Sequence, residues 1–222
     1  MNLIKRGIDL IFPVKCPFCR RILDRGEDIL CTDCQKTLPW LQGRDAERKV
    51  DFSAGCLSPL GYRGQVPDAV HRYKFSGLRC YGGPFGTLLV QCAQDHLTTR
   101  PDAVTWAPLS RERLRERGYD QARLLAQRVG RGLDLPVIPT LIKGRNTAPQ
   151  SDLKEGAARR ANALNAYELL PGADVAGKCL LLVDDVVTSG ATLSECARVL
   201  VMAGAKEVRC LTLAQAREES RS

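Results

Sequence analysis

The chain has 222 residues, of which 44% are hydrophobic, and a formal net charge of +8 at pH 7. This length accommodates one ordinary domain and a small attachment, and the apolar content allows a sizeable core. The positive charge favours an anionic partner, such as a phosphorylated sugar or a nucleic acid. No aliphatic run is long enough to span a membrane, and Asp9 and Pro13 interrupt any signal-peptide core, so we expect a cytoplasmic protein.

Two cysteine pairs follow a short amphipathic arm over residues 1–14. The pairs are Cys16-x-x-Cys19 and Cys31-x-x-Cys34, and two such knuckles complete a tetrahedral shell of four sulfur atoms, which suits structural zinc (Zn²⁺). A segment this small has little core, so the metal would supply most of its folding energy. Two redox pairs, an iron–sulfur site and unrelated cysteines are the alternatives, and the paired spacing favours zinc.

The stretch from Lys36 to Phe52 is polar and reads as a connector, and the sequence becomes apolar and patterned from about Cys56. We therefore expect two domains. The arm and the zinc ribbon would occupy residues 1–55, and a larger domain would occupy residues 56–222.

Helical patterns dominate the first half of the larger domain. One helix is expected from Val66 to Tyr73, with Gly77 as the break after it, and a second over residues 85–97. A third is expected over residues 119–130.

A short apolar strand over residues 103–107 leads into Pro108, Leu109 and Ser110 and then into an arginine-rich loop. Ligands of open α/β sheets collect at the carboxyl ends of the strands, so the stretch from Arg111 to Arg117 is a candidate for binding an anion. A solvated helix face would show a similar charge pattern, and both interpretations stay open.

Another short strand is expected at Val137-Ile138, before a long polar stretch over residues 143–162. A basic loop that contains proline and glycine is usually a plain connection. A loop of this length in a compact domain can also be a lid, and the sequence does not decide between the two.

The most informative stretch begins with four aliphatic residues, Leu180 to Val183, which predict a strand buried on both faces. Asp184 and Asp185 follow where the strand would leave the sheet. A hydroxyl- and glycine-containing turn then leads into a helix that ends near Gly204, and a last strand is expected over residues 207–214.

This arrangement suits a phosphate next to a diol. The hydroxyls of Thr188, Ser189 and Thr192 and the N–H groups of the helix N-terminus can bind an anion, and Gly190 lets the backbone approach it closely. The two carboxylates can accept hydrogen bonds from ligand hydroxyls, so the combination describes a ribose 5-phosphate. No lysine follows a glycine-rich loop and no G-x-G-x-x-G opens the helix, which argues against ATP or a dinucleotide. The alternative is a buried strand, an acidic turn and a capped helix without a ligand.

The thirteen residues from Leu180 to Thr192 resemble the signature that binds 5-phosphoribosyl 1-pyrophosphate (PRPP) in type I phosphoribosyltransferases. Over most of its length, the chain resembles the ComF family of competence-associated, phosphoribosyltransferase-like proteins. The residues that carry this resemblance are the cysteine ribbon, Tyr62-x-Gly64, Tyr73-Lys74-Phe75-x-Gly77, Pro108-Leu109, Arg113, Arg117-Gly118-Tyr119, Gln121-Ala122, Leu125-Ala126, Arg145, Thr147, Gln150 and Arg159-x-x-Asn162. The chain departs from the usual family pattern at Thr105-Trp106-Ala107-Pro108, where relatives have Pro-Val-Pro, and at Asp120, where they have Asn.

The resemblance implies an α/β fold of the type I phosphoribosyltransferase kind, a parallel sheet flanked by helices, with a small N-terminal zinc ribbon. By that analogy Asp184 and Asp185 would be the catalytic residues and would hold the ribose hydroxyls, while Mg²⁺ would be held mainly by PRPP itself. The implied PRPP-binding residues are these two aspartates together with Thr188, Ser189, Gly190, Ala191, Thr192, Pro108, Leu109, Ser110, Arg113, Arg117, Lys74 and Arg159.

Three functions are compatible with these features. We favour a PRPP-binding protein that acts in DNA uptake or utilisation, with single-stranded DNA and competence-machinery proteins as candidate partners. The alternatives are an active phosphoribosyltransferase with an unknown acceptor and a PRPP-sensing regulator that binds nucleic acid. We do not expect a glutamine-dependent amidotransferase, because Asn2 follows Met1 where its cysteine nucleophile would stand, and neither His71 nor His96 has a nucleophile pattern nearby.

Overall fold

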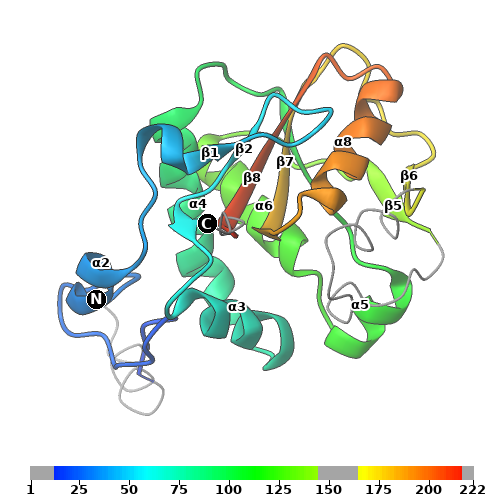
Figure 1. Ribbon diagram of the computed structural model, residues 1–222. Coiled ribbons are helices and arrows are strands. Elements are labelled where there is room, and N and C mark those ends of the chain that lie inside the picture. The colour runs from blue at the N-terminus through cyan, green and yellow to red at the C-terminus, as the bar shows by residue number, and fades with distance from the viewer. Residues whose placement is uncertain (1–12, 145–164, 217–222) are drawn as a thin grey trace, which may run out of the picture.

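The computed structural model describes residues 13–144 and 165–216. They form a six-stranded sheet with helices on both faces, a separate two-stranded sheet, and an N-terminal ribbon at one edge of the molecule (Figure 1). The expected arm lies outside the described residues up to residue 12, and so does most of the long polar stretch, from residue 145 onwards.

The main sheet is mostly parallel. Its strand order is β1-β2-β8-β7-β4, β3 also pairs with β8, and only β1 runs antiparallel to its neighbour β2. The strands are β1 (Glu47–Arg48), β2 (Cys56–Leu57), β3 (Leu60–Gly61), β4 (Ala103–Trp106), β7 (Cys179–Val187) and β8 (Glu207–Gln215). Since β1 belongs to the expected connector, the connector joins the edge of the sheet, and the domain boundary near residue 55 stays a prediction.

The strand β7 lies inside the sheet, between β8 and β4, and is buried on both faces as expected. Side chains alternate along a strand, so Leu181 and Val183 join the core under α4 (Gly82–His96) and α6 (Gln121–Leu133). Leu180 and Leu182 join a second core on the opposite face.

The helices that carry apolar stripes match the sequence predictions. Besides α4 and α6, these are α3 (Val66–Phe75), which Gly77 follows with a positive φ of 67°, and α8 (Ala191–Met202), which covers the second core. The remaining short elements are α2 (Thr32–Thr37) in the ribbon and two 3₁₀ turns, η1 (Gly43–Ala46) and η2 (Arg79–Tyr81). Within the described part of the chain, no helix has both the length and the apolar character that crossing a bilayer requires.

The arginine-rich segment corrects one prediction, because it forms a helix, α5 (Arg111–Arg117), and not a loop. The Ser110 side chain accepts a hydrogen bond from the Arg113 N–H at the start of α5, and Gly118 ends the helix with a φ of 74°. No residue of α5 is buried, so the helix has no apolar stripe from which it could be predicted.

Two strand predictions also need correction. Val137 forms a single bridge with Val104, and the actual strand begins four residues later as β5 (Leu141–Lys143), which pairs antiparallel with β6 (Tyr167–Leu169). These strands are three residues long and far apart in sequence, so neither shows a periodicity. The second strand correction concerns Asp184 and Asp185, which lie inside β7 and not beyond it.

Candidate functional site

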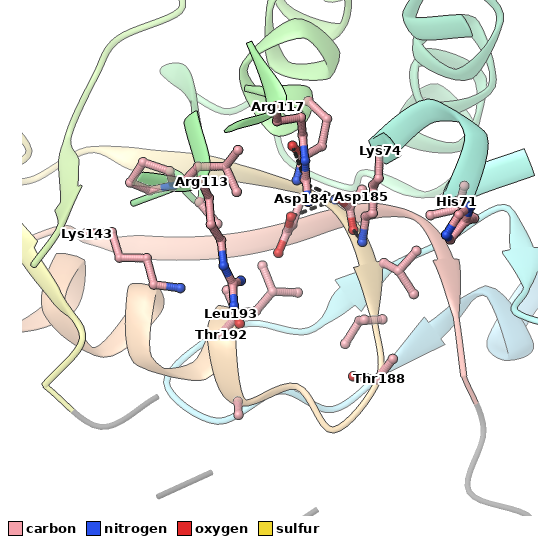
Figure 2. Close-up of a pocket in the computed structure, with 18 of the residues that line it drawn as sticks. His71, Lys74, Arg113, Arg117, Lys143, Asp184, Asp185, Thr188, Thr192 and Leu193 are labelled. Atoms are coloured by element: carbon pink, nitrogen blue, oxygen red, sulfur yellow. Dashed lines mark hydrogen bonds and ion pairs between the residues drawn. The ribbon is translucent and has the colours of Figure 1, made fainter. Parts of the chain in front are cut away.

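A cavity of about 730 Å³ opens at the carboxyl end of β7. Its floor comes from β7 and the first turn of α8, and its walls come from α3, α5, the start of α6 and the β5–β6 pair (Figure 2). Strands of a parallel sheet end at one edge, and this edge is where α/β proteins bind their ligands. The predicted residues that line the cavity are Lys74, Pro108, Leu109, Arg113, Arg117, Asp184, Asp185, Thr188, Ser189, Gly190, Ala191 and Thr192.

Two predicted residues stand apart from this group. Ser110 is buried, is not among the lining residues, and uses its hydroxyl to cap α5. Arg159 lies outside the described residues.

Asp185 is 4% exposed and is held by side chains from two helices. Lys74 Nζ of α3 lies 2.6 Å from its Oδ1, and Gln121 Nε2 of α6 donates a 2.9 Å hydrogen bond to its Oδ2. Gln121 in turn accepts a 2.6 Å hydrogen bond from Arg117. A buried carboxylate needs such partners, so this network fixes the position of Asp185.

Asp184 is partly exposed toward the cavity and accepts a 2.8 Å hydrogen bond from the backbone N–H of Asp185. Burial and the neighbouring charge of Asp185 raise the pKa of Asp184 to about 8, against the opposing effect of Lys74. The two adjacent carboxyl groups therefore differ, with an ion-paired Asp185 beside an Asp184 that holds its proton near neutral pH.

The turn between β7 and α8 has the geometry expected of an anion-binding loop. Gly190 is the N-cap of α8 with a φ of 79°, a conformation that favours glycine. The first N–H groups of α8 have no partners within the helix, and the helix dipole places partial positive charge there. Thr188 and Thr192 lie on the same side of the cavity in Figure 2.

The other walls of the cavity differ in chemistry. Arg113 and Lys143 lie on one side of the aspartates, and His71 lies on the other side (Figure 2). Burial, together with the charge of Arg113, lowers the pKa of Lys143. His71 packs against Phe75 with ring centroids 4.8 Å apart, and the Arg117 guanidinium lies 4.8 Å from the Phe75 ring centroid.

Several residues of these walls were not predicted as site residues from the sequence. They include His71, Phe75, Gln121, Lys143 and Tyr167. Gln121 and Phe75 belong to the stretches that resemble the ComF family, and this resemblance could have identified them as site residues. Lys143 and Tyr167 come from the unpredicted β5–β6 pair, where the Lys143 Nζ lies 4.9 Å from the Tyr167 ring centroid.

The cysteine pairs converge as predicted. The sulfur atoms of Cys16, Cys19, Cys31 and Cys34 all lie within 4.8 Å of one another, and three of these residues are buried. Four thiols and no carboxylate or imidazole form the donor set typical of structural zinc, so the geometry fits that ion. A closed shell of four sulfur ligands leaves no open position for chemistry, and the cluster is therefore a structural site.

Comparisons with known proteins agree with both parts of the chain. A phosphoribosyl transferase domain matches residues 118–221, and a double zinc ribbon domain matches residues 7–45. Competence protein F of Haemophilus influenzae is 29% identical, with coverage of 92% of this chain and 98% of the relative. DNA utilization protein YhgH of Escherichia coli O157:H7 is 34% identical, with coverage of 92% and 100%. Competence protein ComFC of Bacillus subtilis is 28% identical, with coverage of 89% and 76%.

The raised pKa of Asp184 predicts a pH-dependent stability. The unfolded chain would have an aspartate pKa near 4, so between about pH 4 and 8 the folded state binds more protons and the free energy of unfolding falls as the pH rises. Asp184→Asn removes this effect. We expect the variant to be more stable than the parent protein at pH 8 by on the order of 1–3 kcal/mol, with a smaller difference at pH 5, in urea denaturation.

The exposed Asp51→Asn is the control and should track the parent protein at both pH values. A stability difference for Asp184→Asn that is the same at pH 5 and pH 8 would contradict the assignment.

The sulfur cluster predicts the behaviour of a second pair of variants. Cys31→Ser should lose zinc, measured by elemental analysis, and should unfold at a lower temperature, because metal binding contributes folding energy. Cys80→Ser, at an exposed cysteine outside the cluster, should keep one zinc ion per chain. Full zinc content in Cys31→Ser would show that the cluster is not the zinc site.

Proposed function

The chain belongs to the ComF and YhgH family of phosphoribosyltransferase-like proteins linked to competence and DNA utilization, and on this basis we propose that its cavity binds PRPP. The observation that carries the proposal is the convergence of three features in one cavity. These are the anion-binding loop after β7, the pair of aspartates, and a group of four cations.

The loop and the aspartates would bind the ribose 5-phosphate half of the ligand. Backbone N–H groups at the start of α8 and the hydroxyls of Thr188 and Thr192 suit the 5-phosphate. Asp184 and Asp185 stand beside this loop at the end of β7, where their oxygens can accept hydrogen bonds from the two ribose hydroxyls. A protonated Asp184 can also donate a hydrogen bond to a hydroxyl oxygen.

The cations of the cavity would bind the pyrophosphate half. Lys74, Arg113, Arg117 and Lys143 all line the cavity. Burial lowers the pKa of both Arg117 and Lys143, which means that desolvation disfavours their charged forms. A polyanion in the cavity would stabilise these cations, so the cavity is electrostatically suited to such a ligand. Phosphate oxygens are hard ligands for Mg²⁺, which would bring further neutralising charge with the ligand.

Transfer of the phosphoribosyl group to an acceptor is a second candidate function. The rings of His71 and Phe75, which pack against each other and line the cavity, offer a surface against which an acceptor could lie. Displacement of pyrophosphate would build positive charge at the anomeric carbon, close to the two aspartates. The contribution of the protein would be positioning and charge stabilisation.

Single-stranded DNA is the partner that we propose from the family's link to competence and DNA utilization. Arg111 and Arg115 are exposed on α5, next to the wall that carries Arg113, and could contact phosphates without entering the cavity. Binding through such contacts should weaken with salt.

Two arginines on α5 test the proposed function. Arg113 lines the cavity, whereas Arg115 is exposed and is not among the lining residues. Arg113→Met should weaken PRPP–Mg²⁺ binding about 10- to 100-fold in calorimetry, because it removes charge-assisted hydrogen bonds. It should weaken ribose 5-phosphate binding less, because that ligand has no pyrophosphate.

Arg115→Met is the matched control and should bind PRPP as the parent protein does. The proposal fails if the parent protein does not bind PRPP at millimolar concentration, or if the two variants lose the same affinity.

A further inference from the structure

Arg48 supports the anion-binding loop from outside the cavity. Its Nη1 donates hydrogen bonds of 2.8 Å to the carbonyl oxygens of both Thr188 and Ala216. Thr188 begins the loop after β7, and Ala216 follows β8. Arg48 itself is not among the residues that line the cavity. One guanidinium nitrogen thus joins the ends of two neighbouring strands behind the loop.

The planarity of the peptide bond gives this contact a consequence for the ligand side. In a trans peptide, the carbonyl of one residue and the N–H of the next point in opposite directions. Because the Thr188 carbonyl is directed to Arg48, the N–H of Ser189 points away from Arg48, and Ser189 lines the cavity. The same contact directs the Thr188 carbonyl oxygen, with its partial negative charge, away from the side of the loop where an anion would bind.

The segment that carries Arg48 is itself firmly held. Gln215 Nε2 donates a 2.6 Å hydrogen bond to the Asp45 carbonyl, and Ser58 N donates one of 2.8 Å to the Ala46 carbonyl. Val50, two residues after Arg48, lies close behind the loop, since its Cγ2 would be 3.7 Å from a Cβ placed on Gly190. From the sequence, this segment was expected to be a connector.

We propose that Arg48 is a positioning residue that orients the loop's N–H groups toward the 5-phosphate of a bound phosphoribosyl ligand. The inference rests on the proposed function, because it assigns the phosphate to this loop. Arg48 would not touch the ligand and would act through the Thr188–Ser189 peptide. The edge of the sheet that contains β1 would thereby influence how well the cavity binds phosphate.

Substitutions at two arginines of this region test the proposal with ribose 5-phosphate as the calorimetric probe. Arg48→Met keeps an apolar stem and removes the donors, and should weaken binding about 10-fold. Arg48→Lys should lie between Arg48→Met and the parent protein, because its ammonium can still donate hydrogen bonds to the carbonyls. Arg209→Met is the control, since it breaks the 2.7 Å ion pair with Glu47 on the same segment, away from the loop.

Hydrogen exchange separates positioning from a general loss of stability. In Arg48→Met, the amides of residues 188–191 should exchange faster, whereas that of Leu181, in the centre of β7, should not change. If Arg48→Met does not fold, Arg48→Lys becomes the test variant. Unchanged binding of ribose 5-phosphate by Arg48→Lys would then overturn the proposal.

The possible failures are distinguishable. A parent protein that binds neither PRPP nor ribose 5-phosphate overturns the proposed function and this inference together. A parent protein that binds ribose 5-phosphate, with the same affinity and loop exchange in Arg48→Met, overturns only the role of Arg48.

Discussion

Two adjacent carboxylates at the end of a buried strand repel each other and lose hydration, so Asp184 and Asp185 can coexist only if other elements compensate for their charge. Lys74 and Gln121, from helices on the same side of the sheet, hold Asp185, and Asp184 responds with a raised pKa. This arrangement costs stability in the absence of a ligand. Such a cost is common at binding sites, where function and stability make opposing demands.

The helix α3, which carries Lys74, also contacts the zinc ribbon. Arg72 donates hydrogen bonds of 3.0 and 2.7 Å to the carbonyl oxygens of Pro17 and Phe18 in the first cysteine knuckle. The Phe18 and Phe85 rings lie 5.5 Å apart, and Tyr73 packs edge-on against Phe85 at 5.4 Å. The ribbon thus packs against the helix that presents Lys74 to Asp185, so a structural metal site can influence a cavity that it does not line.

The sequence was most informative where one residue type carries a strong local constraint. The aliphatic run before Asp184 predicted the buried strand β7, and the cysteine spacing predicted the sulfur cluster. The sequence was least informative where long-range pairing decides the structure. The partner of β5 lies beyond a long polar stretch, and the role of Arg48 depends on two strand ends about 140 and 168 residues away. Side-chain contacts at such separations leave no periodic pattern in the chain.

The helix α5 is an intermediate case, because its capping residues Ser110 and Gly118 are visible in the sequence. Its charged surface obscured them, since the expectation relied on apolar periodicity. The same surface explains why Arg113 could be nominated for an anion site and still not be distinguished from its neighbours. Only the fold separates the arginine that lines the cavity from those that face solvent.

The most direct test of PRPP binding in this cavity is a crystal structure of the protein with PRPP and Mg²⁺. We expect electron density for the 5-phosphate at residues 188–192 and for the ribose hydroxyls at Asp184 and Asp185. A cavity that contains no ligand at millimolar PRPP, or a ligand bound with its 5-phosphate elsewhere, would contradict this expectation.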